Sequence, residues 1–288
     1  MSIKILKNIS YLCSHLLKSN ILDREQIEAI VEEKMIESLG AQLYPNIKDV
    51  DTTIAQLKTQ QKSMVRFGDG ELQLILGKGI PFQKFSERLS SRLKEILSSS
   101  TKDCLIGVPY FIYSSKQQLN DIPKLFWTSN GKKFRDSIAK YISPSNTYYA
   151  AEFTIASEAY KNFNYEKYWI DLQSIWQNKD ITIICGETVF QKIRFNVFDN
   201  AKSIEYLYAP SVNAFDSYDD IFQKALTIDK TRLVLVILGP TAKVLVYDLA
   251  QNGYTAIDIG HVAKAYDWYC KGKNTLQMKD AVDFFNPE

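Results

Sequence analysis

The stretch Ser63-Met64-Val65-Arg66-Phe67-Gly68-Asp69-Gly70-Glu71 decides how the rest of this sequence is interpreted. It begins with a short apolar run, ends in Asp-Gly-Glu, and is followed by a helix-like apolar segment, Leu72-Gln73-Leu74-Ile75-Leu76. If the chain stays extended to its end, alternate side chains share a face, so Asp69 and Glu71 point into the same crevice. Gly68 and Gly70 have no Cβ, which lets the backbone turn sharply and a ligand approach closely. The stretch therefore predicts a strand, a polar turn and then a helix.

The carboxylates of Asp69 and Glu71 are candidate metal ligands. Hard cations such as Mg²⁺ and Mn²⁺ prefer oxygen ligands, and they commonly take one or two carboxylates together with substrate phosphates. A D-x-E pattern at a strand end is therefore a candidate clamp for a metal and a diphosphate. The alternative is a plain polar turn, Gly-Asp-Gly, between a strand and a helix. The D-x-E pattern alone does not decide between the two.

The composition is that of an ordinary soluble globular protein. The 288 residues are 45% hydrophobic and 24% charged, and this length allows one large α/β domain or two small ones. A net charge of +2 without a long Lys/Arg run gives no indication of nucleic-acid binding. The four cysteines lie far apart without a C-x-x-C motif, which predicts free buried thiols and a cytoplasmic protein. No apolar run is long enough for a membrane span, and no signal-peptide core is found at the N-terminus.

Two amphipathic segments precede the main domain. Residues 3–19 have apolar side chains at helical spacing, and a second segment with Asp23 as a candidate N-cap ends near Gly40. The apolar stripe of the second segment consists of Ile27, Ile30, Val31, Met35 and Leu39. We expect an N-terminal helical extension over residues 1–45 and a main domain over residues 46–288. The extension can pack on the main domain, form a homodimer or rest on a membrane surface as a peripheral association. We expect packing, because three lysines in the first helix give only a modest basic bias.

The main domain alternates between strands and helices. Apolar and β-branched runs predict strands at residues 63–67, 104–109, 148–154, 181–186, 204–209, 233–238 and 255–259, with residues 82–85 extended. Helical spacing predicts helices at residues 49–60, 72–76, 86–97, 218–226 and 242–252, and another near Lys132–Tyr141. This alternation predicts an α/β fold with a mostly parallel sheet and helices on both faces.

Four of the expected strands end in glycine together with polar residues. These endings are Asp69/Glu71, Gly186/Glu187, Gly239/Thr241 and Gly260/His261. Ligands of parallel sheets bind outside the carboxyl ends of the strands. We therefore expect one crevice assembled from distant parts of the sequence.

Three further features have two interpretations each. Gly239-Pro240-Thr241 resembles a phosphate-binding helix start, with free N–H groups and a hydroxyl, but an ordinary N-cap turn fits equally well. Arg66 either faces a phosphate or pairs with a structural acid. His261 is one of two histidines and is either structural or part of the site.

Two well-known motifs are absent from the sequence. There is no G-x-S-x-G that would indicate a serine nucleophile. The G-x-G-x-x-G fingerprint of dinucleotide binding is incomplete, because Gly68-Asp69-Gly70 lacks the third glycine.

Six short motifs together carry a resemblance to a known family. They are Val65–Leu72, Ile80–Gln83, Ile184–Glu187, Asn213–Phe215, Leu238–Ala242 and Asp258–His261. In this order, from about Met64 to Trp268, they resemble the GT-D-type bacterial glycosyltransferases. The resemblance implies a Rossmann-like α/β fold, a Mn²⁺ or Mg²⁺ ion on Asp69 and Glu71, and a UDP-sugar donor. It also implies a glycan acceptor on a surface glycoprotein or polysaccharide, with glucose as the first guess for the sugar.

Residues outside the D-x-E have candidate roles in the same site. Arg66, Gly68, Gly239, Pro240 and Thr241 are the candidate donor-binding residues. If the reaction inverts the sugar configuration a base is needed, and Glu187 and His261 are the candidates.

The sequence departs from the family at two places. The Ser-Arg and Gly-Asn-Asp expected after Gly-Glu are replaced by Thr188-Val189-Phe190 and Arg194-Phe195-Asn196. Acidic positions expected after Gly-His are Ala263 and Ala265, with Asp267 retained. These departures put the donor, the acceptor and the activity itself in question. A non-catalytic nucleotide-sugar-binding or scaffolding protein is therefore the alternative, and a small-molecule methyltransferase is a weaker third interpretation.

Overall fold

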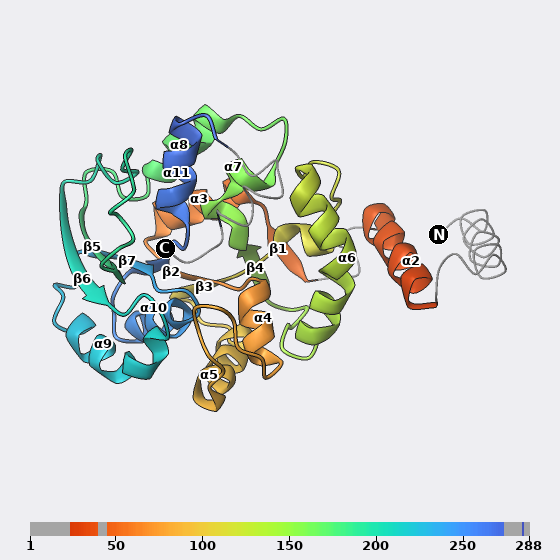
Figure 1. The fold of residues 1–288 in the computed structure, drawn as a ribbon, viewed down its shortest axis with the longest axis horizontal. Coiled ribbons are helices and arrows are strands. Elements are labelled where there is room, and N and C mark those ends of the chain that lie inside the picture. The colour runs from red at the N-terminus through yellow and green to blue at the C-terminus, as the bar shows by residue number, and fades with distance from the viewer. Residues whose placement is uncertain (1–23, 40–44, 274–283, 285–288) are drawn as a thin grey trace.

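The computed structural model describes residues 24–39, 45–273 and 284, and its centre is an eight-stranded sheet with parallel pairing throughout (Figure 1). The strand order across the sheet is β1-β4-β3-β2-β8-β7-β5-β6. The strands are β1 (Asn46–Lys48), β2 (Ser63–Arg66), β3 (Cys104–Val108), β4 (Thr147–Ala150), β5 (Asp180–Gly186), β6 (Ser203–Ala209), β7 (Leu233–Ile237) and β8 (Ala256–Asp258). The predicted α/β class and parallel sheet are confirmed.

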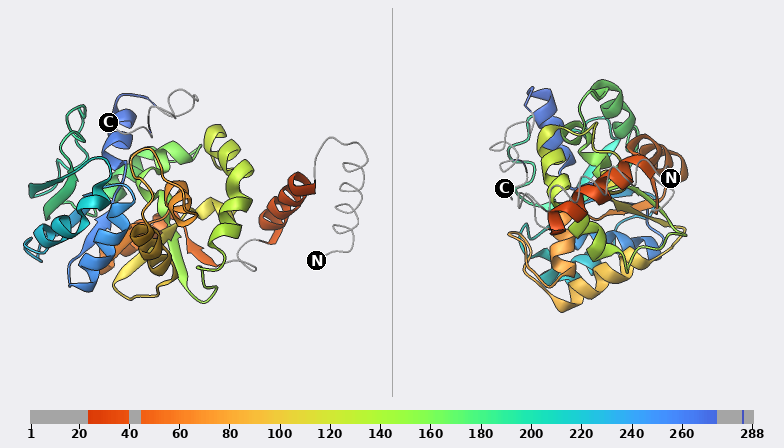
Figure 2. Two further views of the ribbon diagram at one scale, coloured as in Figure 1. Left: turned by 60° about the horizontal axis from the view of Figure 1, so that its bottom comes forward. Right: turned by 90° about the vertical axis from the view of Figure 1, so that its right-hand side faces the viewer.

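Helices cover both faces of the sheet. They are α2 (Arg24–Leu39), α3 (Val50–Gln60), α4 (Asp69–Ile75), α5 (Glu87–Ser98), α6 (Asp121–Ile138), α7 (Ala156–Ala159), α8 (Tyr165–Gln173), α9 (Tyr218–Ala225), α10 (Thr241–Gln251) and α11 (Val262–Cys270). Helices α4, α5, α9 and α10 lie on one face, and α3, α8 and α11 lie on the other (Figures 1 and 2). Because both faces are covered, Val234, Leu235 and Val236 of β7 are fully buried.

Local signals in the sequence explain where several helices begin. The side chain of Asp49 accepts a hydrogen bond from Thr52 N–H at 2.8 Å and caps α3. Ser86 caps α5 in the same way, through Leu89 N–H at 3.4 Å. The predicted apolar stripe of α5, namely Leu89, Leu93, Ile96 and Leu97, is fully buried.

The structure corrects three of the expected elements. Helix α6 begins at Asp121, well before the expected start near Lys132. Pro123 does not break the helix, because it lies in the first turn, where a backbone N–H would have no helical partner. Strand β4 ends at Ala150, and residues 151–154 continue as a turn of 3₁₀ helix. Residues 82–85 are not a strand, because Pro81 and Phe82 form a turn closed by the Ile80–Gln83 bridge.

Helix α2 lies beside α6 (Figure 1), and partly buried ion pairs join it to the main domain. Arg135 Nε lies 2.8 Å from Glu32 Oε1, and Arg135 Nη2 lies 3.0 Å from Glu33 Oε1. Lys116 also pairs with Glu33. This confirms the expected packing for the second amphipathic segment, whereas residues 3–19 lie outside the described residues. The expected stripe of α2 is wrong at Ile30, which is 39% exposed.

Among the described cysteines, Cys104 and Cys185 are buried and free, as expected. Cys270 is also free, but it is exposed and corrects the expectation of burial.

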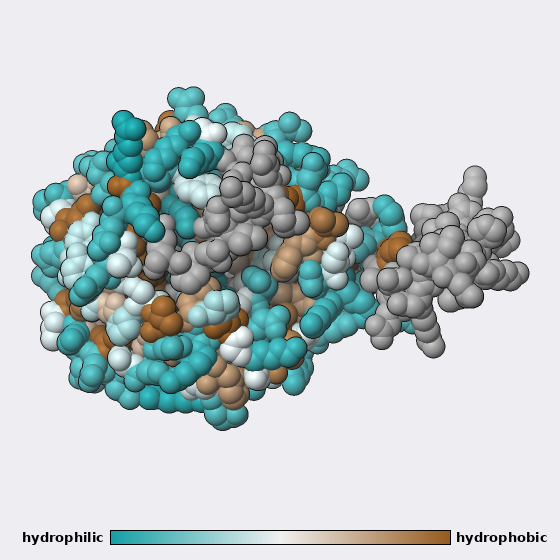
Figure 3. Space-filling view, viewed as in Figure 1, coloured by the Kyte–Doolittle hydropathy of each residue, from teal (hydrophilic) through white to brown (hydrophobic). Residues whose placement is uncertain are grey.

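The described surface is that of an ordinary globular domain. On the face seen in Figure 3, apolar residues form small separate groups among hydrophilic ones. In the described part of the chain, no helix is both long and apolar enough to cross a membrane.

Candidate functional site

The candidate site lies where the connections of the sheet change direction. Strands β2 and β8 are neighbours at the centre of the sheet. The chain leaves β2 into α4 and α5 on one face, and it leaves β8 into α11 on the other (Figure 1). In open α/β sheets such a switch point is where ligands bind. The Asp-Gly-Glu segment and the Gly260-His261 segment begin at this point, as the sequence predicts.

Arg66 is tied to the protein and does not face open solvent. Its Nη1 donates to Thr154 Oγ1 at 2.6 Å and to Ala151 O at 3.2 Å. Its Nη2 lies 3.4 Å from Asp258 Oδ1 at the end of β8. Of the two interpretations of Arg66, pairing with a structural acid matches these contacts. Although burial alone would raise the pKa of Asp258, Arg66 and Lys243 hold it below the usual value.

Lys243 is a buried cation in the first turn of α10 that the sequence analysis did not identify. Its Nζ lies 2.9 Å from Glu71 Oε1 and 3.1 Å from Asp258 Oδ2, and it donates to Gly239 O at 3.1 Å. The side chains of Lys243, Glu71 and Asp258 are 6%, 9% and 1% exposed. We call the chain Arg66–Asp258–Lys243–Glu71 the charge network. A lone lysine among Ala242, Val244 and Leu245 is the signal that could have revealed it.

Two glycines next to the charge network need their missing Cβ. Gly239 has φ +50° and Gly260 has φ +45°, in the left-handed region that side chains rarely adopt. A Cβ on Gly260 would also lie 1.7 Å from Arg66 Nη2. Gly68, by contrast, is extended with φ −125°, so the expected glycine-dependent sharp turn is not found there.

Contrary to the expectation from the sequence, the side chains of Asp69 and Glu71 do not lie on one face of an extended segment. Both lie in the first turn of α4 and not in an extended segment, so they do not share a face. Glu71 reaches back to accept a hydrogen bond from Gly68 N–H at 2.7 Å, which is half of a capping box. Its other oxygen faces Lys243. The argument from strand alternation is therefore wrong, while their roles as metal ligands stay predictions.

Asp69 fits a cation site better than Glu71 does. Its side chain is exposed at the turn, and its carboxyl pKa is raised, first by partial desolvation and then by the negative charge of Glu71. A cation beside Asp69 would relieve both effects. Among the described residues no three His, Cys, Asp or Glu side chains are grouped to hold a metal ion. Asp69 is thus the more accessible of the two candidate metal ligands, whereas Glu71 is buried and paired with Lys243.

The start of α10 is partly closed to a ligand. Thr241 is fully buried, and its hydroxyl faces Gln83 Oε1 at 3.4 Å. The ring of Phe82 lies beside Gly239, where an added Cβ would be 3.2 Å from it. The contacts of the Thr241 side chain are therefore internal. Its donor-binding role, and those of Gly239 and Pro240, stay predictions.

Glu187 and His261, the two candidate bases, differ in environment. Glu187 is exposed directly after β5. His261 is partly buried, with its ring 5.7 Å from that of Phe284. Burial, followed by the charges of Arg66 and Lys264, lowers the pKa of His261 to about 4, so its imidazole is neutral at pH 7.

The positions that depart from the family differ in burial, and Thr188 and Arg194 after β5 are exposed. Ala263 and Ala265 are buried in α11. Asp267, the retained acid, accepts hydrogen bonds from Arg194 N–H at 2.9 Å and Phe195 N–H at 3.1 Å. Asp267 thereby holds the segment that follows Glu187.

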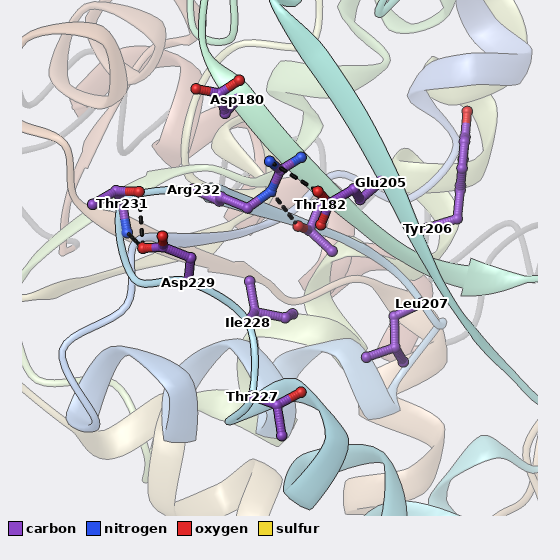
Figure 4. Close-up of a pocket in the computed structure, with 10 residues that line it drawn as sticks. All are labelled: Asp180, Thr182, Glu205, Tyr206, Leu207, Thr227, Ile228, Asp229, Thr231 and Arg232. Atoms are coloured by element: carbon purple, nitrogen blue, oxygen red, sulfur yellow. Dashed lines mark hydrogen bonds and ion pairs between the residues drawn. The ribbon is translucent and has the colours of Figure 1, made fainter.

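A polar cavity of about 540 Å³ lies away from this site (Figure 4). It is next to the beginnings of β5 and β7, at the edge of the sheet opposite to the Asp-Gly-Glu segment. Arg232 in this cavity is already bonded to Thr182 Oγ1 at 2.9 Å and paired with Glu205 at 3.2 Å. The cavity is therefore not part of the candidate site.

Comparison with known proteins places the chain in a family. Residues 64–283 match the family model described as glycosyltransferase GT-D fold. The chain is 33% identical over 232 residues to a probable glycosyl transferase Gly of Streptococcus gordonii, covering 79% of this chain and 33% of that protein. It is 31% identical over 237 residues to the glycosyltransferase GlyD of Streptococcus pneumoniae serotype 4, covering 80% of this chain and 28% of that protein. The chain thus spans about a third of the length of these relatives.

Solved structures agree with this placement. One, described as a new glycosyltransferase (DUF1792) from Streptococcus sanguinis, has a TM-score of 0.75 and 32% identity, and covers 80% of this chain and 86% of that one. Another, described as the domain of unknown function 1792 with a distinct glycosyltransferase fold, has a TM-score of 0.77 and 32% identity over 86% of each chain. The family resemblance seen in the motifs is thereby confirmed, and the chain belongs to the glycosyltransferases of the GT-D fold.

Proposed function

We propose that the chain is a metal-dependent glycosyltransferase that moves a sugar from a UDP-sugar to a hydroxyl of a growing glycan. Glucose is the first candidate sugar, and a surface glycoprotein or polysaccharide is the candidate acceptor. The observation that carries the proposal is the exposed Asp69 at the switch point between β2 and β8, in a chain of the GT-D family. We also propose a cytoplasmic location, which the free cysteines favour.

Asp69 is the residue best placed to hold a divalent cation, Mn²⁺ or Mg²⁺, together with the donor phosphates. When bound, such an ion neutralises negative charge that develops on the departing diphosphate. As a second ligand, Glu71 would hold the ion beside the positive charge of Lys243, whose Nζ lies 2.9 Å from Glu71 Oε1. The remaining N–H groups at the start of α10 favour an anion close by.

The acceptor hydroxyl must lose a proton when it attacks the sugar. If the configuration inverts, a protein base is required, and its pKa should be close to the working pH. His261 is partly buried, with its ring beside that of Phe284, so an acceptor reaches it less easily. The exposed position of Glu187 after β5 favours it as the base.

Calorimetric titration tests the proposal. UDP, UDP-glucose, other UDP-sugars and S-adenosylmethionine are added separately to the protein, with and without Mn²⁺. We expect UDP and at least one UDP-sugar to bind, more tightly with Mn²⁺, and S-adenosylmethionine not to bind. Product analysis of the bound UDP-sugar then separates transfer or hydrolysis from binding alone. Binding without turnover would favour the non-catalytic alternative, and the absence of UDP binding would contradict both.

A further inference from the structure

We infer that Glu71 and Lys243 are positioning residues that fix the donor-binding turns, and that Asp69 alone of the D-x-E carboxylates binds the metal. The inference rests on the proposed function, because it assigns roles within the same site. Its structural part, the coupling of Glu71 to Lys243, is independent of any ligand.

Three oxygen partners surround the ammonium group of Lys243. Its Nζ donates a hydrogen bond to Gly239 O at 3.1 Å and forms ion pairs with Glu71 Oε1 at 2.9 Å and Asp258 Oδ2 at 3.1 Å. Glu71 uses one oxygen for Lys243 and the other for Gly68 N–H. A metal ion on Glu71 would add a second positive charge beside the buried ammonium group of Lys243. Removing one member of a buried pair leaves an uncompensated charge, which is strongly unfavourable.

The charge network also holds one backbone atom in each of three turns. Glu71 accepts from Gly68 N–H after β2, at 2.7 Å. Lys243 donates to Gly239 O after β7, at 3.1 Å. Asp258 accepts from Gly260 N–H after β8, at 3.2 Å. Three strand ends that are far apart in sequence are thus fixed by one connected set of charges, and this set orients the backbone next to Asp69.

A double-mutant cycle on the ligand-free and metal-free protein tests the coupling. The variants are Glu71→Gln, Lys243→Met and the double variant, with Asp219→Asn as the control because Asp219 forms an exposed pair with Arg88. We expect each single substitution to lower the urea midpoint of unfolding. The double variant should unfold at nearly the same urea concentration as the less stable of the two single variants. Additive shifts would overturn the inference, and the control is expected to match the wild type.

Amide NMR spectra of the metal-free protein provide a test that does not depend on Lys243→Met folding. Glu71→Gln keeps the size of the side chain and removes its charge. If the charge network is connected, this substitution shifts the amide resonances of Gly239 and Gly260 as well as that of Gly68. Shifts confined to residues near position 71 would overturn the inference.

Mn²⁺ titration in the presence of UDP tests the division of roles. We expect Glu71→Gln and Lys243→Met to weaken Mn²⁺ binding by the same factor, about ten- to a hundredfold, as is usual for residues that orient a ligand. Asp69→Asn should abolish detectable Mn²⁺ binding. If Glu71→Gln abolishes binding as Asp69→Asn does, while Lys243→Met keeps wild-type affinity, Glu71 is a metal ligand and the inference is wrong. If the wild type binds neither UDP nor Mn²⁺, the proposed function fails while the ligand-free tests still decide the coupling.

Discussion

Individual side chains at the carboxyl edge of the sheet are held by buried polar contacts. Glu152, just after β4, is fully enclosed. Its Oε1 accepts from the hydroxyl of Tyr160 at 2.6 Å, and its Oε2 accepts from Tyr110 N–H at 3.2 Å. Burial raises the pKa of Glu152 to about 7, although these hydrogen bonds and the charge of Arg66 oppose the rise. A carboxyl group near Arg66 therefore changes charge close to neutral pH.

This pKa predicts a pH dependence of stability. Because the pKa of Glu152 in the folded state is above its ordinary value of 4.5, the folded state binds the proton more tightly. The resulting stabilisation is complete below about pH 4.5 and is lost as the pH rises through about 7. Glu152→Gln, which cannot ionise, should remove this loss, amounting to ~3 kcal/mol at most in the free energy of unfolding.

Urea unfolding of both proteins at several pH values between 5 and 8 measures the difference. The lowered pKa of His261 acts in the opposite direction between about pH 6.5 and 4. It is common to both proteins and cancels in the comparison. Equal pH slopes for the wild type and Glu152→Gln would contradict the prediction.

The substitution Thr241→Val tests whether the Thr241 hydroxyl binds phosphate or makes an internal contact. The sequence predicts a contact with phosphate, whereas the structure buries the hydroxyl against Gln83. We expect the valine variant to lose about 1 kcal/mol in the free energy of unfolding and to keep its UDP affinity. Calorimetry with UDP and Mn²⁺, together with urea unfolding, measures both. A loss of about 1 kcal/mol in UDP binding with unchanged stability would restore the role in phosphate binding.

At the scale of elements, α2 is attached to the main domain by charge as well as by apolar packing. Lys116 and Arg135 are buried, and Glu32 and Glu33 of α2 are their acidic partners. Arg135 also donates a hydrogen bond to Ile112 O at 2.7 Å, and this contact within the main domain does not involve α2. Without α2, two buried cations would lose their counter-charges.

A chain that begins at Ala41 should therefore be less soluble or change its oligomeric state, while UDP and metal binding survive. Size-exclusion chromatography with light scattering compares it with the full chain. Glu32→Gln/Glu33→Gln in the full chain is the matched variant, and it should be less stable than the wild type. The truncated protein could instead keep the solubility and the oligomeric state of the full chain and lose only liposome binding. That result would show that the N-terminal segment binds a membrane surface.

Seven strands of the sheet were predictable because they carry strong local signals, whereas the three-residue strand β1 was not predicted. The runs that became β5 and β7 are rich in Ile, Val and Leu, and the stripe of α5 has clear helical spacing. The start of α6 was missed because Pro123 suggests a break, although the first turn of a helix tolerates it. The charge network was missed because it joins residues far apart in sequence, and periodicity contains no information about such pairs. Lys243 and Asp258 each stand alone in an apolar segment, and that was the available clue.

At the scale of the whole molecule, the sheet places four distant strand endings along one edge. The switch point between β2 and β8 concentrates Asp69, Glu71 and Gly260 at the centre of that edge, while Glu187 follows β5 further along. This arrangement supports the proposed donor site, because ligands of parallel sheets bind outside the carboxyl ends of the strands. The departures after Glu187 and His261 lie in segments other than the one that carries Asp69.

The central claim is tested most directly by measuring the activity of Asp69→Asn in the presence of Mn²⁺. The assay follows sugar release and sugar transfer from UDP-glucose and other UDP-sugars. The control is Asp219→Asn on α9, an exposed carboxylate far from the switch point in sequence. We predict that Asp69→Asn keeps the circular-dichroism spectrum and urea midpoint of the wild type and loses roughly a hundredfold or more in rate, because the cation contributes several kcal/mol. The control should be as active as the wild type. Full activity in Asp69→Asn with every donor that the wild type uses would contradict the account.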